Sequence, residues 1–285
     1  MIMSRSLNPK SLAALAALVL PVVHANPVSP VVKRQNPLIG ALPTCSRELE
    51  SRFQPGKFSI DPRPCAFDFD MDSCYNAPAV DGNGNVNPGR DPCEIGIPND
   101  AAVCRQPSYL DNNNVYVRSR SNNGWTAQLW GYYFETDVRD VCAGHRHDWE
   151  HVVVWIEGET VRYVAASAHG DYDVRPIDEV LQVDGHPKIV YHKDGRSTHC
   201  MRFAKEDDDN PVENHTGNWY FGGIVDYYGF PSTEIRDAML NNDWGSGTID
   251  FTDENFAEAL RKAKGGHDIP FDTGVDDEGT TSRPC

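Results

Sequence analysis

The sequence has few basic side chains for its length. Its 285 residues include 26 Lys and Arg against 42 Asp and Glu, which gives a formal net charge of −16. A surface this acidic argues against binding of nucleic acid and against electrostatic docking on anionic lipid. It is compatible with neutral or sugar-bearing partners and with cations.

Long hydrophobic runs are also lacking, apart from one short run near the N-terminus. Arg5 and Lys10 precede the apolar residues 12–23. This run is too short for a membrane-spanning helix and is typical of a secretory signal peptide. We therefore expect a signal peptide at residues 1–25.

The dibasic pair Lys33-Arg34 follows this segment and is typical of a secretory processing site. It predicts a short propeptide at residues 26–34. Removing all 34 residues, which carry four basic and no acidic side chains, lowers the net charge from −16 to −20. Residues 35–285 then form a single domain in a secreted, extracellular protein.

Cysteine pairs of the C-x-x-C type are absent, which argues against a zinc site built from cysteines. The cysteines number eight and all follow residue 34. An even number in a secreted chain predicts up to four disulfides. They are Cys45, Cys65, Cys74, Cys93, Cys104, Cys142, Cys200 and Cys285.

Regular helical periodicity is missing from the middle third of the chain. Short runs rich in β-branched and aromatic residues occur there instead, separated by Gly, Asp and Asn. They span residues 115–117, 127–134, 149–157, 161–166, 188–192 and 200–204. Strands at this spacing, without helices between them, predict a mainly β fold, an antiparallel β-sandwich.

Two peripheral helices are predicted near the C-terminus. The first opens at residues 231–234, and Asp253 is expected to cap the second. In the second, Phe256, Leu260 and Ala263 repeat at helical spacing. Upstream of the strands, residues 35–109 are rich in Pro, Gly, Asn and Asp and predict loops stapled by disulfides.

The most polar stretch beside a predicted strand is the heptapeptide Gly144-His145-Arg146-His147-Asp148-Trp149-Glu150, followed by the largely apolar residues 151–156. Burying such charges beside a core strand costs several kcal/mol per ion unless they are paired or bound to a metal. The heptapeptide therefore predicts a functional site.

A zinc protease is one interpretation, because His147 and His151 are four residues apart. The protease motif needs a helix to bring both imidazoles onto one face. The β-branched continuation predicts a strand, which would separate the two residues by about 13 Å. One zinc ion cannot bind both at that separation, so this interpretation is rejected.

A hard divalent cation fits the strand better. Strand alternation places Asp148 and Glu150 on one face, beside a turn that holds His145. Carboxylates with at most one imidazole favour Ca²⁺ or Mg²⁺ over zinc. A further carboxylate is expected from Asp137 or Asp140 in the preceding loop. A salt-bridge cluster with Arg146 and without metal remains open as the alternative.

The complete heptapeptide resembles the signature of the necrosis- and ethylene-inducing-peptide-like proteins, which are secreted cytolysins and immune elicitors of plant-associated fungi, oomycetes and bacteria. Further stretches resemble this family in the same order along the chain. They are residues 74–80, 115–119, 131–137, 167–170, 190–195, 198–199 and 213–219, followed by the two helices.

This resemblance implies an actinoporin-like β-sandwich with a divalent ion at one end. It selects Asp137 over Asp140 and implies the metal ligands Asp137, His145, Asp148 and Glu150. Arg146 and His147 would then either hold the metal ligands in place without touching the ion or stabilise the turn. The resemblance also implies a disulfide between Cys74 and Cys104 and leaves the pairing of the other six cysteines open.

In cytolytic members of the family, the pocket recognises the sugar head group of plant glycosyl inositol phosphorylceramides. The match implies that His199 contacts this head group, and we place His169 with it. The chain departs from the family at Gly195, where an exposed Trp is usual. It also has Thr136 in place of a Lys in the stretch associated with immune recognition. Recognition by plant immune receptors therefore does not follow from the resemblance.

The expected function is thus a metal-dependent cytolysin and virulence factor that binds plant membranes, induces necrosis and has no enzymatic turnover. The alternatives are a non-cytolytic member of the fold that binds sugar or lipid, and a metal-dependent hydrolase. Asn214-His215-Thr216 is in addition an N-glycosylation sequon.

Overall fold

The computed structural model describes residues 38–45, 66–69, 73–94 and 103–277. All of them belong to the compact unit Gln35–Cys285. The predicted signal peptide and propeptide lie outside the described residues, as do Cys65 and Cys285.

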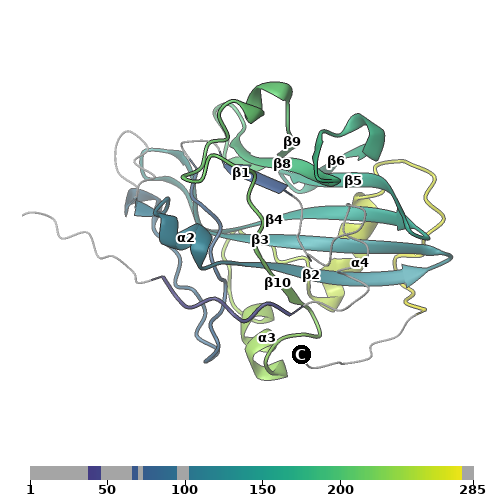
Figure 1. Cartoon of the computed structure of the whole chain (residues 1–285). Coiled ribbons are helices and arrows are strands. Elements are labelled where there is room, and N and C mark those ends of the chain that lie inside the picture. Colours follow the sequence, from purple (N-terminus) through teal and green to yellow (C-terminus); the bar gives the residue numbers. More distant parts are fainter. Residues whose placement is uncertain (1–37, 46–65, 70–72, 95–102, 278–285) are drawn as a thin grey trace, which may run out of the picture. The chain divides into compact units, whose positions relative to one another are not determined.

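The larger of two β-sheets has six strands in the order β10-β2-β3-β4-β5-β6 (Figure 1). Neighbouring strands are antiparallel, except that β10 runs parallel to β2. The strands are β2 (Asn114–Asn122), β3 (Trp125–Asp140), β4 (Ala143–Glu157), β5 (Thr160–Ala168), β6 (Asp171–Pro176) and β10 (Gly223–Asp226).

The smaller sheet is centred on β8, which pairs parallel with β1 and antiparallel with β7 and β9. Its strands are β1 (Ala66–Phe69), β7 (Gln182–Val183), β8 (His186–Lys193) and β9 (His199–Phe203). The rings of Phe134 in β3 and Tyr191 in β8 stack at 3.7 Å between centroids, which joins the two sheets. The predicted β-sandwich is confirmed, with two parallel pairs that local sequence patterns do not reveal.

Strand β4 owes its central position to its composition. Residues 147–156 are buried throughout, because the strand lies between β3 and β5 and is covered on both faces. Trp149 packs on Tyr133 and Trp244, with ring centroids 5.4 and 5.5 Å away. The polar heptapeptide therefore begins a core strand, and its Asp148 and Glu150 are only 6% and 7% exposed.

The helices are α2 (Pro107–Asp111), α3 (Thr233–Leu240) and α4 (Asp253–Lys262), with short 3-10 turns at Pro92–Glu94, Ile177–Glu179 and Glu206–Asp209. The two predicted C-terminal helices are present, and the Ser232 side chain caps α3 by accepting from the Ile235 amide. The predicted cap of α4 was wrong. Thr252 is the cap and accepts from the Asn255 amide, while Asp253 is the first helical residue.

Thr252→Ala should lower the free energy of unfolding by about 1 kcal/mol, because the Asn255 amide loses its acceptor at the start of α4. Thr252→Ser keeps a hydroxyl at the cap and is the matched control. Urea unfolding of both variants measures the difference. Equal stability of the two variants would show that the threonine hydroxyl does not cap this helix.

Disulfides tie the loops of the N-terminal region to the sandwich. Cys74 pairs with Cys104, with a Cα–Cα distance of 5.1 Å, and Cys93 pairs with Cys142 at 4.1 Å. Cys45 is also disulfide-bonded. Cys200 is a buried free thiol, so the upper limit of four disulfides is not reached.

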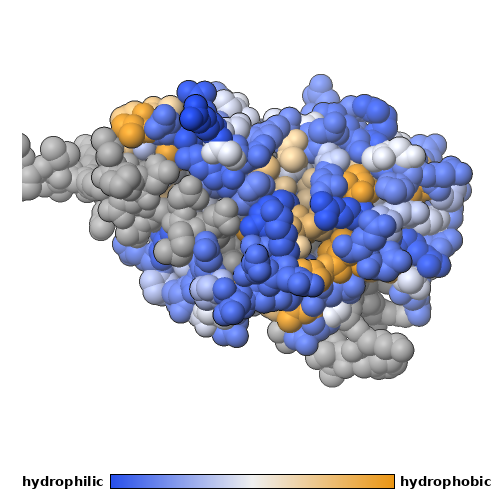
Figure 2. All heavy atoms as spheres, turned by 90° about the horizontal axis from the view of Figure 1, so that it is seen from above, coloured by the Kyte–Doolittle hydropathy of each residue, from blue (hydrophilic) through white to orange (hydrophobic). Residues whose placement is uncertain are grey.

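None of the helices in the described part of the chain combines the length and the hydrophobicity needed to cross a bilayer. The face shown in Figure 2 is mainly hydrophilic, and apolar side chains appear on it in small groups. Among the described residues, the large hydrophobic side chains that are strongly exposed are Val141 and Val275, at 46% and 43%.

Candidate metal and ligand site

The β3–β4 hairpin explains why residues eight positions apart meet at one site. Its register places Asp137 directly opposite His145. Both Asp137 and Asp140 lie in β3, so the expectation that they belong to a loop was wrong. Asp137 is buried at 1% exposure, whereas Asp140 is exposed. Asp137 is thus the carboxylate that the hairpin brings into the interior.

Gly144 allows the two strands to approach at this point. Its φ is +135°, and a Cβ atom there would lie 2.0 Å from the carbonyl oxygen of Asp137. Both the backbone conformation and the close contact require glycine. The first residue of the heptapeptide therefore serves the geometry of the pair Asp137 and His145.

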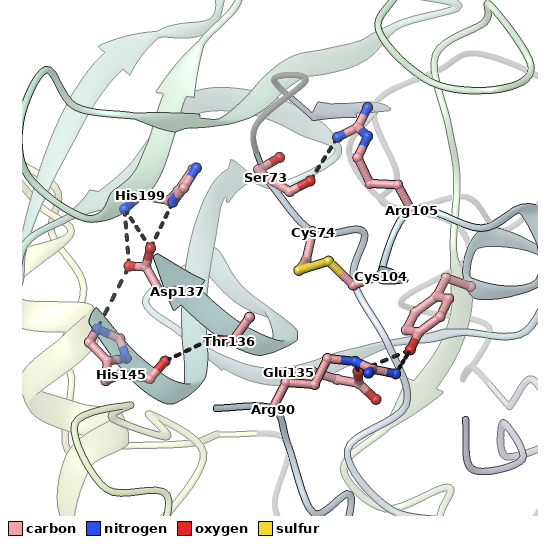
Figure 3. Close-up of a disulfide and its surroundings, with 11 residues drawn as sticks. Ser73, Cys74, Arg90, Cys104, Arg105, Glu135, Thr136, Asp137, His145 and His199 are labelled. Carbon is pink, nitrogen blue, oxygen red and sulfur yellow. Dashed lines mark hydrogen bonds and ion pairs between the residues drawn. A yellow bond between two sulfur atoms is a disulfide. The ribbon is translucent and has the colours of Figure 1, made fainter. Parts of the chain in front are cut away.

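Asp137, His145 and Asp148 form a compact group of metal-ligand side chains. One atom of each lies within 4.8 Å of the other two. The Nε2 of His145 is 3.7 Å from Oδ2 of Asp137 (Figure 3). The Nδ1 of His145 lies 2.7 Å from the carbonyl oxygen of His147. Because a carbonyl only accepts, Nδ1 carries the proton and Nε2 turns its lone pair toward the carboxylates.

Two residues from the smaller sheet hold the carboxylates in place. The backbone amide of His199 donates to both oxygens of Asp137 at 3.0 Å, and Nδ1 of His199 lies 2.7 Å from Oδ1 (Figure 3). The hydroxyl of Tyr191 donates to Oδ2 of Asp148 at 2.8 Å. The site is therefore built at the junction of the two sheets.

Glu150 lies in the same pocket but not in the compact group of three. Its Oε2 accepts a hydrogen bond from the Ser167 hydroxyl. Burial and the charge of Asp148 raise the pKa of Glu150 well above its usual value. Burial and the charge of Asp137 raise the pKa of Asp148 to about 7. Three carboxylates that repel one another in this way favour a bound cation.

The pocket is a cavity of about 410 Å³ in which these carboxylates line one wall. His169 and His199 line it as well, and so do residues from the C-terminal third of the chain. These last are Ser246, Thr248, Asp250, Asn255, Glu258, Ala259 and Lys262. The sequence analysis missed these C-terminal lining residues, because only the folded chain brings them close to the β3–β4 hairpin.

Ser167 and Tyr191 are two further site residues that the sequence analysis did not single out. Ser167 binds Glu150, and Tyr191 binds Asp148. Both belong to stretches that resemble the family, residues 167–170 and 190–195, and this was the signal that could have identified them.

The other two residues of the heptapeptide, Arg146 and His147, do not point to the pocket. The guanidinium of Arg146 donates to the carbonyl oxygens of Pro88 and Gly89 at 3.1 and 3.2 Å. His147 adopts a φ of 63°, and its Nδ1 lies 2.7 Å from the Tyr133 hydroxyl. His147 thus supports the site through its backbone carbonyl, and Arg146 fixes the adjoining loop.

Gly195 lies in the turn between β8 and β9. It is exposed, has a φ of +59°, and has no heavy atom within 4 Å of an added Cβ. Asn214 of the sequon is half-buried, and its amide is engaged in a local turn with Thr216 and Asn218.

The donor set matches a hard cation. Asp137 and Asp148 could offer carboxylate oxygens and His145 one nitrogen to an ion, and Glu150 is a further carboxylate that lines the same cavity. Among the described residues, no Lys or Arg forms an ion pair with these carboxylates. Ca²⁺ and Mg²⁺ prefer such oxygen-rich surroundings, so the residues fit these ions.

Comparison with known proteins supports a specific family. The family model for necrosis inducing protein (NPP1) matches residues 62–263. Necrosis-inducing protein NPP1 of Phytophthora nicotianae is 35% identical over 195 residues, which cover 67% of this chain and 76% of that protein. NLP effector protein 10 of Phytophthora capsici is 30% identical over 196 residues, with the same coverage of 67% and 76%.

Solved structures agree with the sequence comparison. NLPPya in complex with mannosamine superposes with a TM-score of 0.63 at 28% identity. The match covers 79% of this chain and 95% of NLPPya.

Proposed function

Because the chain belongs to the family of necrosis-inducing proteins (NPP1), we propose that it is a secreted toxin that binds plant plasma membranes in a cation-dependent manner. Its target is the sugar head group of glycosylated sphingolipids. Binding leads to membrane damage and necrosis, without enzymatic turnover. The relatives are named as necrosis-inducing and effector proteins, which supports this proposal.

The observation that carries the proposal is the pocket with three buried carboxylates that pair with no Lys or Arg among the described residues. Asp137, Asp148 and Glu150 would repel one another if all were ionised without a cation. Ca²⁺ or Mg²⁺ held by Asp137, His145, Asp148 and Glu150 would remove this repulsion. When bound, the ion also supplies coordination positions for hydroxyl oxygens.

The protein's own side chains would orient the sugar around this ion. His169 and His199 line the pocket and offer imidazole groups to sugar hydroxyls. His199 is held by Asp137, so its position depends on the carboxylate cluster. The binding of an amino sugar by the structural neighbour NLPPya supports a sugar as the ligand.

The N-terminal segment belongs to the same proposal. We infer that residues 1–25 are removed as a signal peptide and residues 26–34 as a propeptide, which leaves residues 35–285 as one secreted domain. The sequon at Asn214 is a glycosylation site in this scheme. Because the Asn214 amide is engaged with Thr216 and Asn218, modification would have to displace these hydrogen bonds.

A non-cytolytic sugar-binding or lipid-binding member of the family is the second candidate function. The exposed turn between β8 and β9 carries Gly195, which has no side chain to enter a membrane interface. Under this alternative, the protein binds the head group without damaging the bilayer.

Dye leakage from plant plasma-membrane vesicles tests the proposal. Wild-type protein with Ca²⁺ should cause leakage, and Asp148→Ala should reduce the rate at least about tenfold, as expected for the loss of more than 1.4 kcal/mol of binding. Asp140→Ala is the matched control, because it removes the same charge from the same hairpin outside the pocket. Chelation of the cation should abolish leakage by the wild type.

The possible outcomes separate the two candidates. Equal leakage by wild type and Asp148→Ala would contradict a role for the carboxylate cluster. Cation-dependent binding to the vesicles without leakage would favour the non-cytolytic function. Vesicles prepared without glycosylated sphingolipids should show neither binding nor leakage.

A further inference from the structure

A second group of metal-ligand side chains lies beside the pocket. It consists of His169, Asp194 and Cys200, and one atom of each lies within 4.8 Å of the other two. His169 follows β5, Asp194 follows β8, and Cys200 lies in β9. The side chains of His169 and Asp194 contact each other, and the Cys200 thiol contacts His192, so these hydrogen bonds do not involve the carboxylate cluster.

The separations suit a tetrahedral ion. Zinc binds sulfur at about 2.3 Å and imidazole nitrogen or carboxylate oxygen at about 2.0–2.2 Å, which requires neighbouring ligand atoms about 3.3–3.6 Å apart. The Nε2 of His169 lies 3.1 Å from Oδ2 of Asp194. This pair is therefore already close to the spacing of two ligands of one ion.

Two tight turns present these ligands. His169 has a φ of 52° and precedes Gly170, whose φ is 85°, in the turn that joins β5 to β6. A positive φ is uncommon outside glycine, and His169 adopts it in a two-residue hairpin turn. Asp194 begins the turn between β8 and β9 and is followed by Gly195 with a φ of 59°. The backbone thus directs both side chains to the same place.

Cys200 provides the ligand that distinguishes this group from the carboxylate cluster. It is 2% exposed and carries a free thiol, although other cysteines of the chain are in disulfides. Its Sγ lies 3.5 Å from Nε2 of His192. The Nδ1 of His192 lies 3.0 Å from the carbonyl oxygen of Lys193, so Nδ1 carries the proton and Nε2 faces the sulfur as an acceptor.

We propose that His169, Asp194 and Cys200 form a zinc-type metal site at the rim of the pocket. A thiolate, an imidazole and a carboxylate are the ligand types that Zn²⁺ takes, whereas Ca²⁺ and Mg²⁺ take oxygen ligands. Three protein ligands leave a fourth position open for water or for a ligand. On binding, the Cys200 thiol loses its proton to solvent, and the sulfur turns from the hydrogen bond with His192 to the ion.

This site goes beyond the proposed cation-dependent membrane binding, because it shares no ligand with the Ca²⁺ or Mg²⁺ site and takes another class of metal. It gives His169, which lines the pocket, a role as a zinc ligand beside its proposed place near the sugar. An ion there would link the turn at His169 to the turn at Asp194. His169 lines the pocket, as does Thr198 from the β8–β9 turn. Zinc would therefore order the rim through which a sugar enters the cavity.

Titration of the full chain with Co²⁺ under reducing conditions tests this site. Cobalt replaces zinc in tetrahedral sites, and a cobalt–thiolate bond gives a charge-transfer absorption band that a carboxylate site lacks. Wild-type protein should develop this band at one equivalent. Zn²⁺ should remove the band, and excess Ca²⁺ should not.

The variants assign the ligands. Cys200→Ser should abolish the band. His169→Ala should weaken zinc binding by about tenfold or more, since the loss of even a residue that only supports a metal ligand costs about tenfold to a hundredfold in affinity. Asp148→Asn should keep the band, because Asp148 belongs to the carboxylate cluster. His169→Ala replaces an exposed turn residue and keeps the test available if Cys200→Ser does not fold.

Absence of the band from the wild type would overturn the zinc-type site. Survival of the band in Cys200→Ser, or zinc binding of unchanged strength in His169→Ala, would overturn it as well. Failure here would leave the Ca²⁺-dependent leakage and its loss in Asp148→Ala unaffected, so the two proposals are tested separately.

Discussion

Asp148→Asn should abolish the stabilisation of the folded protein by Ca²⁺. An ion that binds only the folded state stabilises it by about 4 kcal/mol when its concentration is a thousand times Kd. Asp148 is one of the three residues whose ligand atoms converge, and an amide in its place removes one negative charge from the cluster. Urea unfolding with Ca²⁺ and with chelator measures the effect in wild type and variant.

Asp140→Asn is the control for this experiment. Asp140 lies in the same hairpin and is exposed, so this variant should respond to Ca²⁺ as the wild type does. A Ca²⁺ response that persists in Asp148→Asn would show that the cation binds elsewhere.

In the absence of the cation, Asp148→Asn should raise the stability of the folded protein instead of lowering it. Burial and the charge of Asp137 raise the pKa of Asp148 to about 7 from 3.8. The folded state therefore binds more protons than the unfolded state between these two values, and stability falls as the pH rises through this window. Without Ca²⁺, Asp148→Asn should be more stable than the wild type at pH 8, and the difference should vanish toward pH 4.

His147 also makes the stability of the wild type depend on pH, so the effect of Asp148 must be measured as the difference between the wild type and Asp148→Asn. Burial, together with the charge of Arg146, lowers the pKa of His147 to about 4 from 6.5. Its contribution to stability is present above pH 6.5 and is lost as the pH falls through about 4, which is opposite in sign to that of Asp148. The difference between wild type and Asp148→Asn isolates the carboxylate, because His147 is present in both.

Much of the site could be predicted because it is local in the sequence. The heptapeptide contains His145, Asp148 and Glu150, and its β-branched continuation identified β4 as a strand. Residue patterns alone left Asp137 and Asp140 as equal candidates. The register of the β3–β4 hairpin separates them, because it places Asp137 opposite His145 and inside the fold.

The parts that could not be predicted depend on distant segments. Tyr191 and His199 reach the carboxylates from the smaller sheet, and the spacing of residues in one strand says nothing about which sheet faces it. The parallel pairing of β10 with β2 joins segments about a hundred residues apart. Thr252 and Asp253 are both good caps, and only the start of the helix decides between them.

The cysteines illustrate the same limit. The resemblance to the family implied the pair Cys74 and Cys104, and the structure has this disulfide. It also pairs Cys93 with Cys142 in the hairpin turn, a choice that needs the three-dimensional approach of the loop around residues 88–94. Cys200 keeps a free thiol in β9, while the other cysteines of the described residues are all disulfide-bonded.

Glu135→Ala should lower the free energy of unfolding by about 3–5 kcal/mol, because it leaves a buried charge without its partner. Glu135 and Arg90 are 1% and 4% exposed and form an ion pair (Figure 3). Glu135 also accepts from the Tyr109 hydroxyl at 3.0 Å and from the Asn87 amide at 3.2 Å. This network attaches the loop that contains Arg90 to Glu135 in β3, and Glu135 lies two residues before Asp137.

A double-mutant cycle shows whether the loss comes from the unpaired charge. Arg90→Met combined with Glu135→Leu replaces both charges by apolar side chains of similar length and should recover most of the stability, since buried ion pairs can be exchanged for well-packed hydrophobic residues at little cost. Urea unfolding of the wild type, both single variants and the double variant gives the coupling energy. If the two single losses simply add in the double variant, Arg90 and Glu135 stabilise the fold independently and the buried pair does not hold the loop. If the double variant is restored, its response to Ca²⁺ should also match that of the wild type, because Asp137 then keeps its place in β3 opposite His145.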